Sequence, residues 1–366
     1  MDRRTFLKAL GFLPLALGGK ISTQEGIHPA MHWISLDNNR VQCRNCPNRC
    51  MLKPGETGIC RARKNIDGKL YTLVYGNPCA VHLDPIEKKP LFHFMPGTYA
   101  FSIATAGCNF YCLYCQNYQI SQVGPGKTTN YNLPPEGVIQ NVFAYRNSYD
   151  ISSIAYTYTE PTIFFEYMYD TAKIAKKSGI KNVYHSNGYI EKEPLIQLID
   201  FLDGANIDLK FFDDQMYKKI SGGFLEPVLE TLKTLKKRDV HLEVTNLIIP
   251  TINDNMDEIK KMVIWIKGNI GKETPLHFSR FFPMYKLRNL PPTPIETVEK
   301  ARSLALDLGM EYAYVGNVPY GHPGENTYCP HCHKLLIKRY GFSIIENHLK
   351  NGKCPYCGTR IAGVWE

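Results

Sequence analysis

From Phe101 onward, short runs of β-branched and aromatic residues alternate with longer stretches in which apolar residues recur at helical spacing. This alternation is typical of parallel strands joined by crossover helices. The predicted strands are residues 101–106, 153–158, 182–187, 205–211, 241–249, 275–281 and 312–317. The predicted helices are residues 135–146, 161–178, 193–202, 225–238, 255–268 and 294–309. The pattern therefore predicts an α/β fold, with fewer strand–helix units than the eight of a closed barrel.

Polar side chains share one face of two of these strands. Successive side chains of a strand point to opposite faces, and the apolar face must meet the helices. By this count the inward residues are Asn206, Asp208, Lys210, His241, Glu243 and Thr245. Unpaired charge in a barrel centre is costly, so we expect either a zwitterionic ligand there or a buried salt-bridge network without a ligand.

Composition and charge narrow the class of protein. The chain has 366 residues, of which 44% are hydrophobic and 12% aromatic, which fits one large folded domain with small appendages and excludes a disordered chain. The net charge of +9 arises from 43 basic and 34 acidic residues, many of them in helical runs that a solvated helix face explains. A nucleic-acid surface is the alternative, although no arginine-rich arm accompanies the charge.

Three of the twelve cysteines follow the first predicted strand directly. Cys108, Cys112 and Cys115 have C-x3-C-x2-C spacing on one short loop, where Gly107 allows a tight turn. Iron–sulfur clusters are bound by cysteine thiolates, usually four, so three would leave one iron of a [4Fe–4S] cube open to another ligand. A structural zinc ion is the alternative, but it would require a fourth protein ligand.

This loop, with Tyr114 before its last cysteine, resembles the motif of the radical S-adenosylmethionine (SAM) superfamily. More narrowly, its Gly-Cys-Asn-Phe and Tyr-Cys-Gln-Asn-Tyr elements resemble the pyruvate formate-lyase-activating-enzyme-like branch, and especially the AmmeMemoRadiSam system radical SAM enzymes. The similarity runs from about Cys43 to the C-terminus. It implies a partial (β/α)6 TIM-like radical SAM barrel, open at one side, that holds a [4Fe–4S] cluster and SAM.

The same resemblance assigns SAM binding to six residues: Tyr114, Glu160, Asn187, Asp208, Lys210 and Asn246. It names no catalytic residue. The chain departs from the family pattern where Tyr158 and Thr159 replace two glycines before Glu160, and where His185 precedes the Ser-Asn-Gly element. Glu160 has a simpler interpretation as the start of the following helix, since Pro161 suits the first helical position.

Two further cysteine sets flank the predicted barrel. The first consists of Cys43, Cys46, Cys50 and Cys60, which could bind structural zinc, slightly favoured, or an auxiliary iron–sulfur cluster. The second consists of Cys329, Cys332, Cys354 and Cys357, two C-x2-C pairs that predict a zinc ribbon, with a rubredoxin-like iron site as the alternative. Cys79 belongs to neither set and is expected to be a buried thiol.

The chain therefore divides into four predicted parts. Residues 1–30 form a leader that resembles a twin-arginine signal, residues 31–95 the first cysteine region and a lead-in, residues 96–318 the barrel, and residues 319–366 the zinc-ribbon-like domain. The apolar run of the leader is shorter than the roughly 20 residues that span a bilayer, so no transmembrane span is expected. The metal-type cysteines and the SAM chemistry favour the cytoplasm; export or membrane tethering through the leader is the alternative.

The expected function is that of a radical SAM enzyme. Such an enzyme cleaves SAM reductively at a [4Fe–4S] cluster to a 5′-deoxyadenosyl radical, which abstracts hydrogen from a substrate that the sequence does not identify. The resemblance implies a low-potential electron donor, a protein, nucleic-acid or small-molecule substrate, and a functional link to Memo-like and AMMECR-like proteins. The alternatives are an activase of glycyl-radical enzymes and a metal-stabilised nucleic-acid-binding adaptor.

Overall fold

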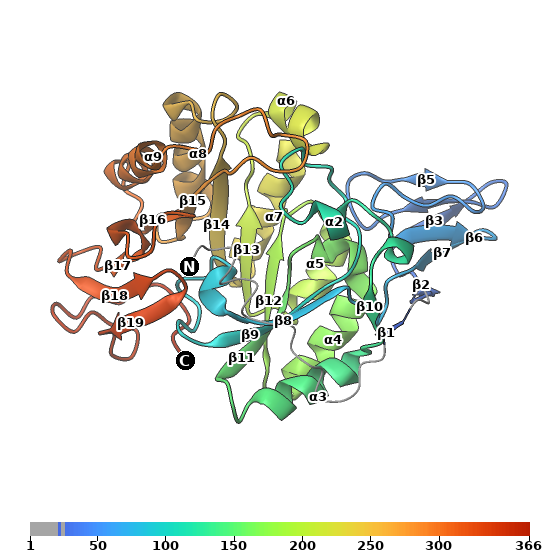
Figure 1. Ribbon diagram of the computed structural model, residues 1–366, viewed down its shortest axis with the longest axis horizontal. Coiled ribbons are helices and arrows are strands. Elements are labelled where there is room, and N and C mark those ends of the chain that lie inside the picture. The colour runs from blue at the N-terminus through green and yellow to red at the C-terminus, as the bar shows by residue number, and fades with distance from the viewer. Residues whose placement is uncertain (1–20, 23–25) are drawn as a thin grey trace.

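A computed structural model describes residues 21–22 and 26–366 of the chain, so most of the predicted leader lies outside the described residues. Its centre is an eight-stranded sheet in the order β16-β15-β14-β13-β12-β11-β9-β8 (Figure 1). The strands are β8 (Ala80–Pro85), β9 (Tyr99–Ala104), β11 (Ile151–Tyr156), β12 (Lys181–Ser186), β13 (Gly204–Asp208), β14 (His241–Ile248), β15 (Leu276–Arg280) and β16 (Ala313–Gly316). All neighbours pair in parallel except β8, which is antiparallel to β9 at one edge. The predicted α/β class is confirmed.

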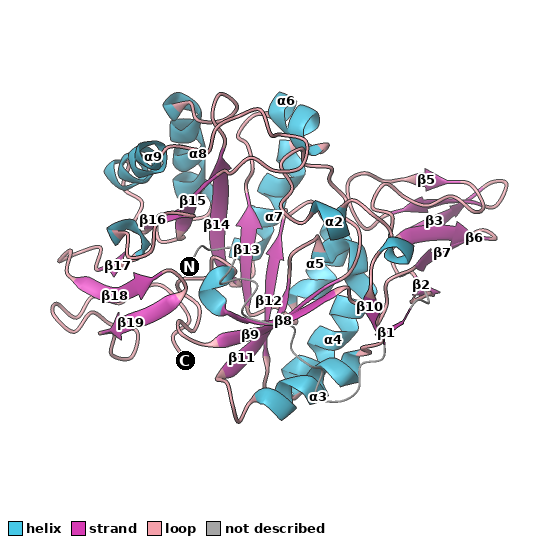
Figure 2. Ribbon diagram, in the orientation of Figure 1, coloured by secondary structure: helices cyan, strands magenta, loops and turns pink. Residues whose placement is uncertain are grey.

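Helices connect successive strands and pack along the sheet (Figure 2). They are α3 (Pro135–Tyr145), α4 (Phe165–Lys177), α5 (Lys192–Ile199), α7 (Leu225–Lys237), α8 (Met256–Asn269) and α9 (Ile295–Asp307). Each matches a helix predicted from the sequence, except that the first residues of the predicted helix 161–178 form a 3-10 turn, η3 (Pro161–Phe164), before α4. None of the helices among the described residues has the length and apolar character needed to cross a membrane.

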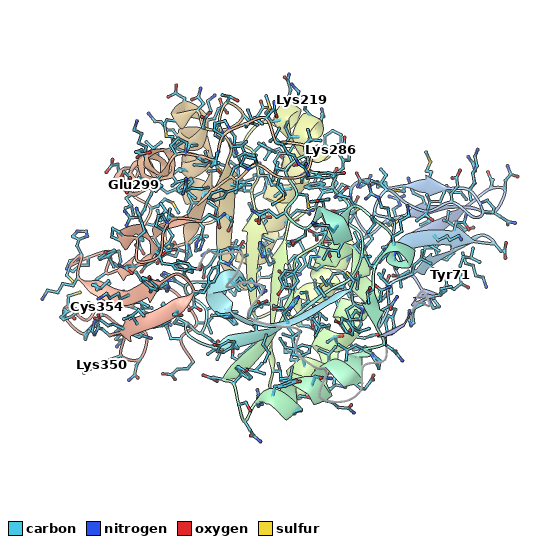
Figure 3. All side chains as sticks on the ribbon, viewed as in Figure 1. Tyr71, Lys219, Lys286, Glu299, Lys350 and Cys354 are labelled. Carbon is cyan, nitrogen blue, oxygen red and sulfur yellow. The ribbon has the colours of Figure 1, made fainter. Side chains whose placement is uncertain are left out.

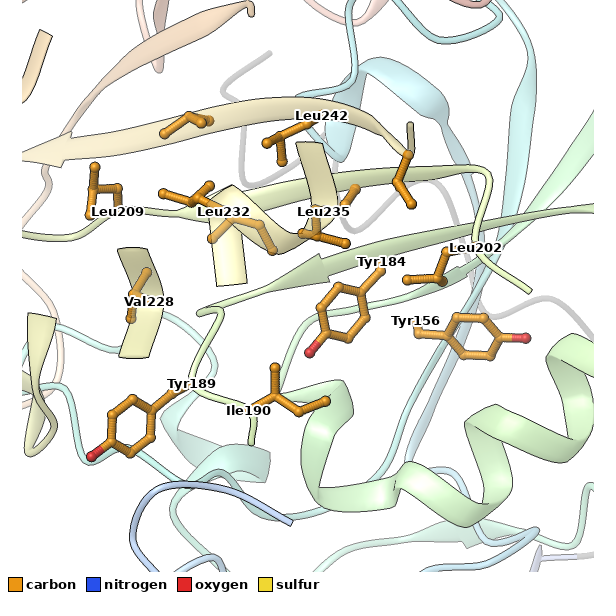
Figure 4. Packing of buried hydrophobic residues seen from close by; sticks show 14 of the residues in the cluster. Tyr156, Tyr184, Tyr189, Ile190, Leu202, Leu209, Val228, Leu232, Leu235 and Leu242 are labelled. Carbon is orange, nitrogen blue, oxygen red and sulfur yellow. The ribbon is translucent and has the colours of Figure 1, made fainter. Parts of the chain in front are cut away.

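The main core lies between the sheet and these helices. Helix α7 buries Val228, Leu232 and Leu235, which lie on one face because they are spaced by four and three residues. Figure 4 shows Leu232 and Leu235 beside Leu242 of β14, with Val228 farther along the helix near Leu209. After β12 the backbone passes close to the same helix at Gly188, whose φ is +70° and where a Cβ atom would lie 2.9 Å from Ile207. Glycine is therefore required at this strand end.

The strands end one to three residues earlier than predicted, and the reason is clear for two of them. The predicted strand 205–211 ends at Asp208, because Leu209 N–H turns back to the carbonyl of Ile207 and Lys210 N–H donates to the Tyr217 hydroxyl. Lys210 therefore lies beyond the strand, so strand parity does not apply to it, but its side chain still meets Asp208, with Nζ 2.8 Å from Oδ2. The predicted strand 153–158 ends at Tyr156, since Tyr158 has a φ of +62° that a strand does not accommodate.

Small antiparallel sheets stand at opposite ends of the long axis of the molecule (Figure 1). At the N-terminal end, two three-stranded sheets are formed by β3 (Trp33–Leu36), β4 (Arg40–Cys43) and β5 (Met51–Leu52), and by β2 (His28–Pro29), β7 (Lys69–Thr72) and β6 (Arg63–Ile66). At the C-terminal end, β17 (Thr327–Tyr328), β18 (Leu335–Tyr340) and β19 (Ser343–Asn347) form a third. The predicted divisions at residues 30, 95 and 318 stay predictions.

Candidate active site

The loop that carries Cys108, Cys112 and Cys115 follows β9 and is fixed by main-chain hydrogen bonds. Residues of the π-helical turn η4 (Tyr217–Ser221) accept from it, at 3.0 Å from Tyr111 N and at 3.0 Å from Leu113 N. Gly107 has a φ of +104°, and a Cβ atom there would lie 2.3 Å from the carbonyl oxygen of Cys60. The close approach that requires this glycine is thus to the N-terminal cysteine region.

The three thiols of this loop have polar neighbours. Ser221 Oγ lies 3.3 Å from Cys112 Sγ, and Ser121 Oγ lies 3.1 Å from Cys115 Sγ. The backbone N–H of Phe110 donates to Cys108 Sγ at 3.4 Å. Hydrogen bonds to sulfur orient thiolate ligands and tune the potential of an iron–sulfur cluster.

The spacing of the same three sulfur atoms suits a cluster. Among the described residues, they do not form a group whose ligand atoms all lie within 4.8 Å of one another. Around one zinc ion, with Zn–S bonds of about 2.3 Å, two thiolates stand about 3.8 Å apart. In a cube each thiolate binds a different iron, so the thiolates stand farther apart. The donor set therefore fits an iron–sulfur cluster better than a single ion.

Glu160 joins the ends of two strands. Its carboxylate accepts hydrogen bonds from Thr162 N at 2.9 Å, Ser186 Oγ at 2.8 Å and Asn187 N at 2.9 Å, and its side chain is buried. Burial raises the pKa of Glu160, although these donors lower it. The residue caps η3 with Pro161 in the first turn, as its simpler interpretation expected. A contact with SAM stays a prediction.

Asn187 links the end of β12 to the cysteine loop. Its Nδ2 donates to Asn109 Oδ1 at 2.8 Å, and its Oδ1 accepts from Tyr189 N at 2.9 Å. Asn109 in turn donates to the carbonyl of Tyr189 at 2.8 Å. Sequence reasoning did not single out Asn109, and its place directly after Cys108 was the available signal. The two asparagines hold the loop in register with the third strand of the barrel.

Asp208 and Lys210 form an ion pair at the carboxyl end of β13. Lys210 Nζ lies 2.8 Å from Asp208 Oδ2, and His185 Nε2 lies 3.4 Å from Asp208 Oδ1. The Asp208 side chain is 29% exposed. Burial raises its pKa, but the Lys210 charge and the His185 hydrogen bond outweigh burial and hold that pKa below its usual range. A charged carboxylate, an ammonium and an imidazole thus meet at a partly open position.

Tyr114 and Asn246 lie beside this pair. Tyr114 is buried with its ring in edge contact with Phe211. Asn246 Nδ2 donates to the carbonyl of Leu209 at 2.7 Å, while its Oδ1 is buried without a partner among the described residues. The hydroxyl of Thr105, at the start of the cysteine loop, is likewise buried and unpartnered within the described chain. Such orphaned polar atoms are the kind that a bound ligand satisfies.

A second charged cluster near this site was not predicted. Asp84 of β8 lies 2.6 Å from both Lys88 Nζ and Lys89 Nζ and accepts from the Tyr158 hydroxyl. Lys89 also lies over the Tyr158 ring, 4.2 Å from its centroid. Asn117 of the cysteine loop donates to the Tyr158 carbonyl at 2.6 Å. Tyr158 therefore occupies a left-handed position, where the family pattern has glycine, with its side chain tied to β8.

The outer cysteine sets differ in geometry. The C-terminal sulfur atoms of Cys329 and Cys357, and those of Cys332 and Cys354, lie 3.6 Å apart, and all four lie within 4.8 Å of one another. Figure 3 shows Cys354 at the end of the molecule opposite Tyr71, which lies in the N-terminal region. This arrangement fits one metal ion, and its identity as zinc stays a prediction. The N-terminal four cysteines line one hollow, together with Arg63.

Comparisons with known proteins identify the family. The chain is 50% identical over 334 residues to uncharacterized protein MJ0808 of Methanocaldococcus jannaschii, which covers 91% of this chain and 98% of that protein. The radical SAM superfamily matches residues 102–266, which include the cysteine loop. The chain belongs to the radical SAM superfamily. Members of this superfamily are enzymes, and the family implies a [4Fe–4S] cluster and SAM as cofactors.

More distant relatives include activating enzymes. The chain is 25% identical over 217 residues to the pyruvate formate-lyase 1-activating enzyme of Escherichia coli, covering 56% of this chain and 87% of that enzyme. A crystal structure of a domain of pyruvate-formate lyase-activating enzyme from Bacteroides vulgatus is 17% identical, with a TM-score of 0.40, and covers 45% of this chain and 99% of that one. Membership of the narrower AmmeMemoRadiSam system stays a prediction for this radical SAM protein.

Proposed function

We propose that this protein binds a [4Fe–4S] cluster through Cys108, Cys112 and Cys115 and cleaves SAM reductively. When bound, the reduced cluster supplies the electron that breaks the C5′–S bond of SAM, and the resulting 5′-deoxyadenosyl radical removes hydrogen from a substrate. The observation that carries the proposal is that three thiols lie on one loop, and that one of them, Cys112, interacts electrostatically with both members of the partly exposed Asp208–Lys210 pair.

The residues of the chain would divide the work of binding SAM by charge. Asp208 and Lys210 offer a carboxylate and an ammonium to the zwitterionic amino acid end of SAM. Asn246 Oδ1 and the Thr105 hydroxyl offer unpartnered polar atoms to the ribose or the adenine. The buried ring of Tyr114 would exclude water beside them. Asn187 and Glu160 act as positioning residues, because chain donors already occupy their side chains.

The experiment is anaerobic reconstitution with iron, sulfide, SAM and dithionite, followed by measurement of 5′-deoxyadenosine. The wild type should form it, and Cys112→Ala should not, because a thiolate ligand is lost. Cys79→Ala is the matched control, since Cys79 belongs to none of the three sets, and it should keep full activity. Equal product from wild type and Cys112→Ala would refute the assignment. Salt-sensitive RNA binding that survives this loss would favour an adaptor instead.

A second candidate function is the activation of a glycyl-radical enzyme. The similarity to pyruvate formate-lyase 1-activating enzyme over 217 residues favours it and supports a protein as substrate. Anaerobic incubation with a candidate partner protein should then produce a glycyl radical detected by electron paramagnetic resonance. The motif resemblance supports a narrower proposal, membership of the AmmeMemoRadiSam system with Memo-like and AMMECR-like partners. Co-purification of such partners with the tagged chain would test it, and their absence would count against it.

A further inference from the structure

The four N-terminal cysteines converge on one hollow from three segments. Cys43 ends β4, Cys46 and Cys50 lie in the turn that leads to β5, and Cys60 precedes β6. All four line the same hollow. Main-chain hydrogen bonds fix their frame: Cys43 N donates to the Cys50 carbonyl at 3.0 Å, and Gly58 N donates to the Arg63 carbonyl at 2.8 Å. The fold therefore holds the main chain of these segments around one hollow.

These sulfur atoms do not converge as the four ligands of one ion do. In the described part of the chain, the C-terminal cysteines are the metal-type group whose ligand atoms all lie within 4.8 Å of one another, and no three of the N-terminal sulfur atoms do so. Tetrahedral zinc requires sulfur atoms about 3.8 Å apart. Gly58 lies next to two of the sulfur atoms, because a Cβ atom there would be 3.7 Å from Cys50 Sγ and 3.8 Å from Cys60 Sγ.

A buried cation faces the same hollow with unused donors. The Arg63 side chain is 2% exposed, and its Nη2 donates to both carboxylate oxygens of Glu166, at 2.9 and 2.7 Å. Its Nε and Nη1 are buried and have no partner among the described residues. Leaving buried charged donors without an acceptor destabilises a protein, so these two N–H groups call for one. Sulfur atoms of an anionic centre in the hollow would accept from them.

We infer that Cys43, Cys46, Cys50 and Cys60 bind a second [4Fe–4S] cluster, to whose sulfur atoms Arg63 donates hydrogen bonds. The sequence left zinc and a cluster open with zinc slightly favoured, and the sulfur spacing reverses that preference. Because four protein thiolates close all four irons, this cluster would not bind SAM.

The second cluster would lie directly behind the SAM-binding loop. Asn48 Nδ2, between two of its cysteines, donates to the carbonyl of Asn109 at 2.8 Å. The Cys60 carbonyl packs so closely against Gly107 that a Cβ atom at residue 107 would clash with it. The two cysteine regions thus pack against each other, whereas the C-terminal set lies at the far end of the molecule (Figure 1).

The deciding experiment separates the two clusters. The triple variant Cys108→Ser/Cys112→Ser/Cys115→Ser is reconstituted anaerobically, and iron, sulfide and zinc are counted per chain. A second cluster predicts about four irons and four sulfides in this variant and about eight of each in the wild type. Adding Cys46→Ser should lower the iron count and the sulfide count by about four each, in the triple variant and in the wild type alike. Cys79→Ser is the control that should change neither count.

Two results would overturn the inference. In the first, the triple variant contains no sulfide and two zinc ions, one for each outer cysteine set. In the second, the triple variant contains two irons and two sulfides, which is the content of a smaller cluster. If the triple variant does not fold, Cys46→Ser in the wild-type background decides, because a second cluster predicts a drop from about eight irons per chain to about four, and an unchanged iron count would exclude it. None of these counts depends on SAM cleavage, so a failed proposal for the first cluster remains distinguishable from failure of the second.

Arg63→Lys tests the hydrogen bonds. Lysine keeps a cation for Glu166 but removes the Nε and Nη1 donors. Donors to sulfur stabilise the reduced cluster, so the variant, made in the triple background, should keep its iron and show a more negative midpoint potential. An unchanged potential would exclude Arg63 as a donor. A merely structural arginine would change the stability of the protein without moving that potential.

Discussion

Each end of the barrel strands carries a charged cluster built on a carboxylate that points into the barrel. The two clusters differ in the groups that donate hydrogen bonds to this carboxylate. At the carboxyl end, Asp208 is 29% exposed, and its partners among the described residues are the side chains of Lys210 and His185. At the amino end, Glu243 is fully buried, and its oxygens accept from the main chain. The donors are Phe92 N at 3.0 Å and His93 N at 2.7 Å.

Histidines complete the amino-end cluster. His277 Nε2 donates to Glu243 at 2.7 Å and His241 Nε2 at 3.0 Å. Burial raises the pKa of Glu243, but these hydrogen bonds outweigh it and hold that pKa well below its usual range. The comparison teaches that an inward carboxylate marks a ligand site only where main-chain donors have not already filled its lone pairs. Glu243 is structural by this criterion, and Asp208 is free to bind.

The largest effect should follow from removing the buried carboxylate. Glu243→Ala leaves two N–H groups and two imidazoles without their acceptor, so the free energy of unfolding should fall by about 3–5 kcal/mol. Urea unfolding measures it. Glu258→Ala, which removes a surface ion pair with Lys261, is the control and should change stability by less than about 1 kcal/mol. An unchanged stability together with lost SAM binding would place Glu243 in the active site instead.

Glu87 gives the amino end a pH dependence. It is buried beneath Arg339 of β18, and its Oε1 accepts from Gly97 N at 2.8 Å. Burial raises the pKa of Glu87 to about 7 from 4.5, so its contribution to stability is present below about pH 4 and is lost as the pH rises through 7. Glu87→Gln cannot ionise and should be more stable than wild type at pH 8 by up to about 3 kcal/mol.

The difference between Glu87→Gln and wild type should vanish at pH 4, where the carboxyl is protonated in both the folded and the unfolded state. Unfolding curves at pH 4, 6 and 8 provide the test. A gain of equal size at all three pH values would mean that packing, not ionisation, is responsible. No change in SAM affinity is expected at any pH at which the protein is folded, because Glu87 lies at the opposite end of the strands from the proposed SAM site.

At the carboxyl end, Asp208→Asn should affect binding more than stability. The amide keeps the shape but loses the charge that faces Lys210, so the affinity for SAM should fall about 30-fold, or about 2 kcal/mol. Calorimetric titration of SAM into the cluster-loaded protein measures this change. Asp257→Asn, exposed in the first turn of α8, is the control that should leave affinity unchanged. An unfolding loss as large as that of Glu243→Ala, with unaltered affinity, would erase the distinction between the two ends.

The sequence predicts the local part of this comparison well. Strand periodicity placed Asp208 and Glu243 inward, and turn residues placed the strand ends to within a few positions. It did not show that Lys210 lies beyond its strand, because the ladder ends where Lys210 N–H donates to the hydroxyl of Tyr217, seven positions away. Nor did it show the pairing of Asp84 with Tyr158, since this contact joins segments 74 residues apart that local patterns do not relate.

The cysteine sets illustrate the same limit. Spacing along the chain identified all three sets, yet Cys43 to Cys60 and Cys329 to Cys357 both satisfied the same four-thiolate rule. Only the distances between the sulfur atoms distinguish one ion from a cluster, and these distances depend on how separate segments pack. The sequence also did not reveal the hydrogen bonds that Glu243 accepts, because its main-chain donors come from residues about 150 positions earlier.

The smallest effect should come from Thr245, which lies between the two ends. Its hydroxyl donates to Asn206 Oδ1 at 2.9 Å, and Asn206 donates in turn to the carbonyl of Pro90 at 2.7 Å. Register places Asn206 opposite Glu243 and Thr245 opposite Asp208, so this hydrogen bond marks the boundary between the clusters. Thr245→Val keeps the shape and removes the donor, which should lower stability by about 1 kcal/mol.

SAM affinity of Thr245→Val should stay within about twofold of wild type if the boundary lies where the structure has it. Thr245→Ser restores the donor and should recover most of the lost stability, which separates the hydrogen bond from the packing of the side chain. If Thr245→Val instead weakens SAM binding by about tenfold while unfolding is unchanged, the ligand reaches deeper than Asp208. In that case the SAM site would include Thr245, and the boundary between the two clusters would lie at the next pair of residues in register, Asn206 and Glu243.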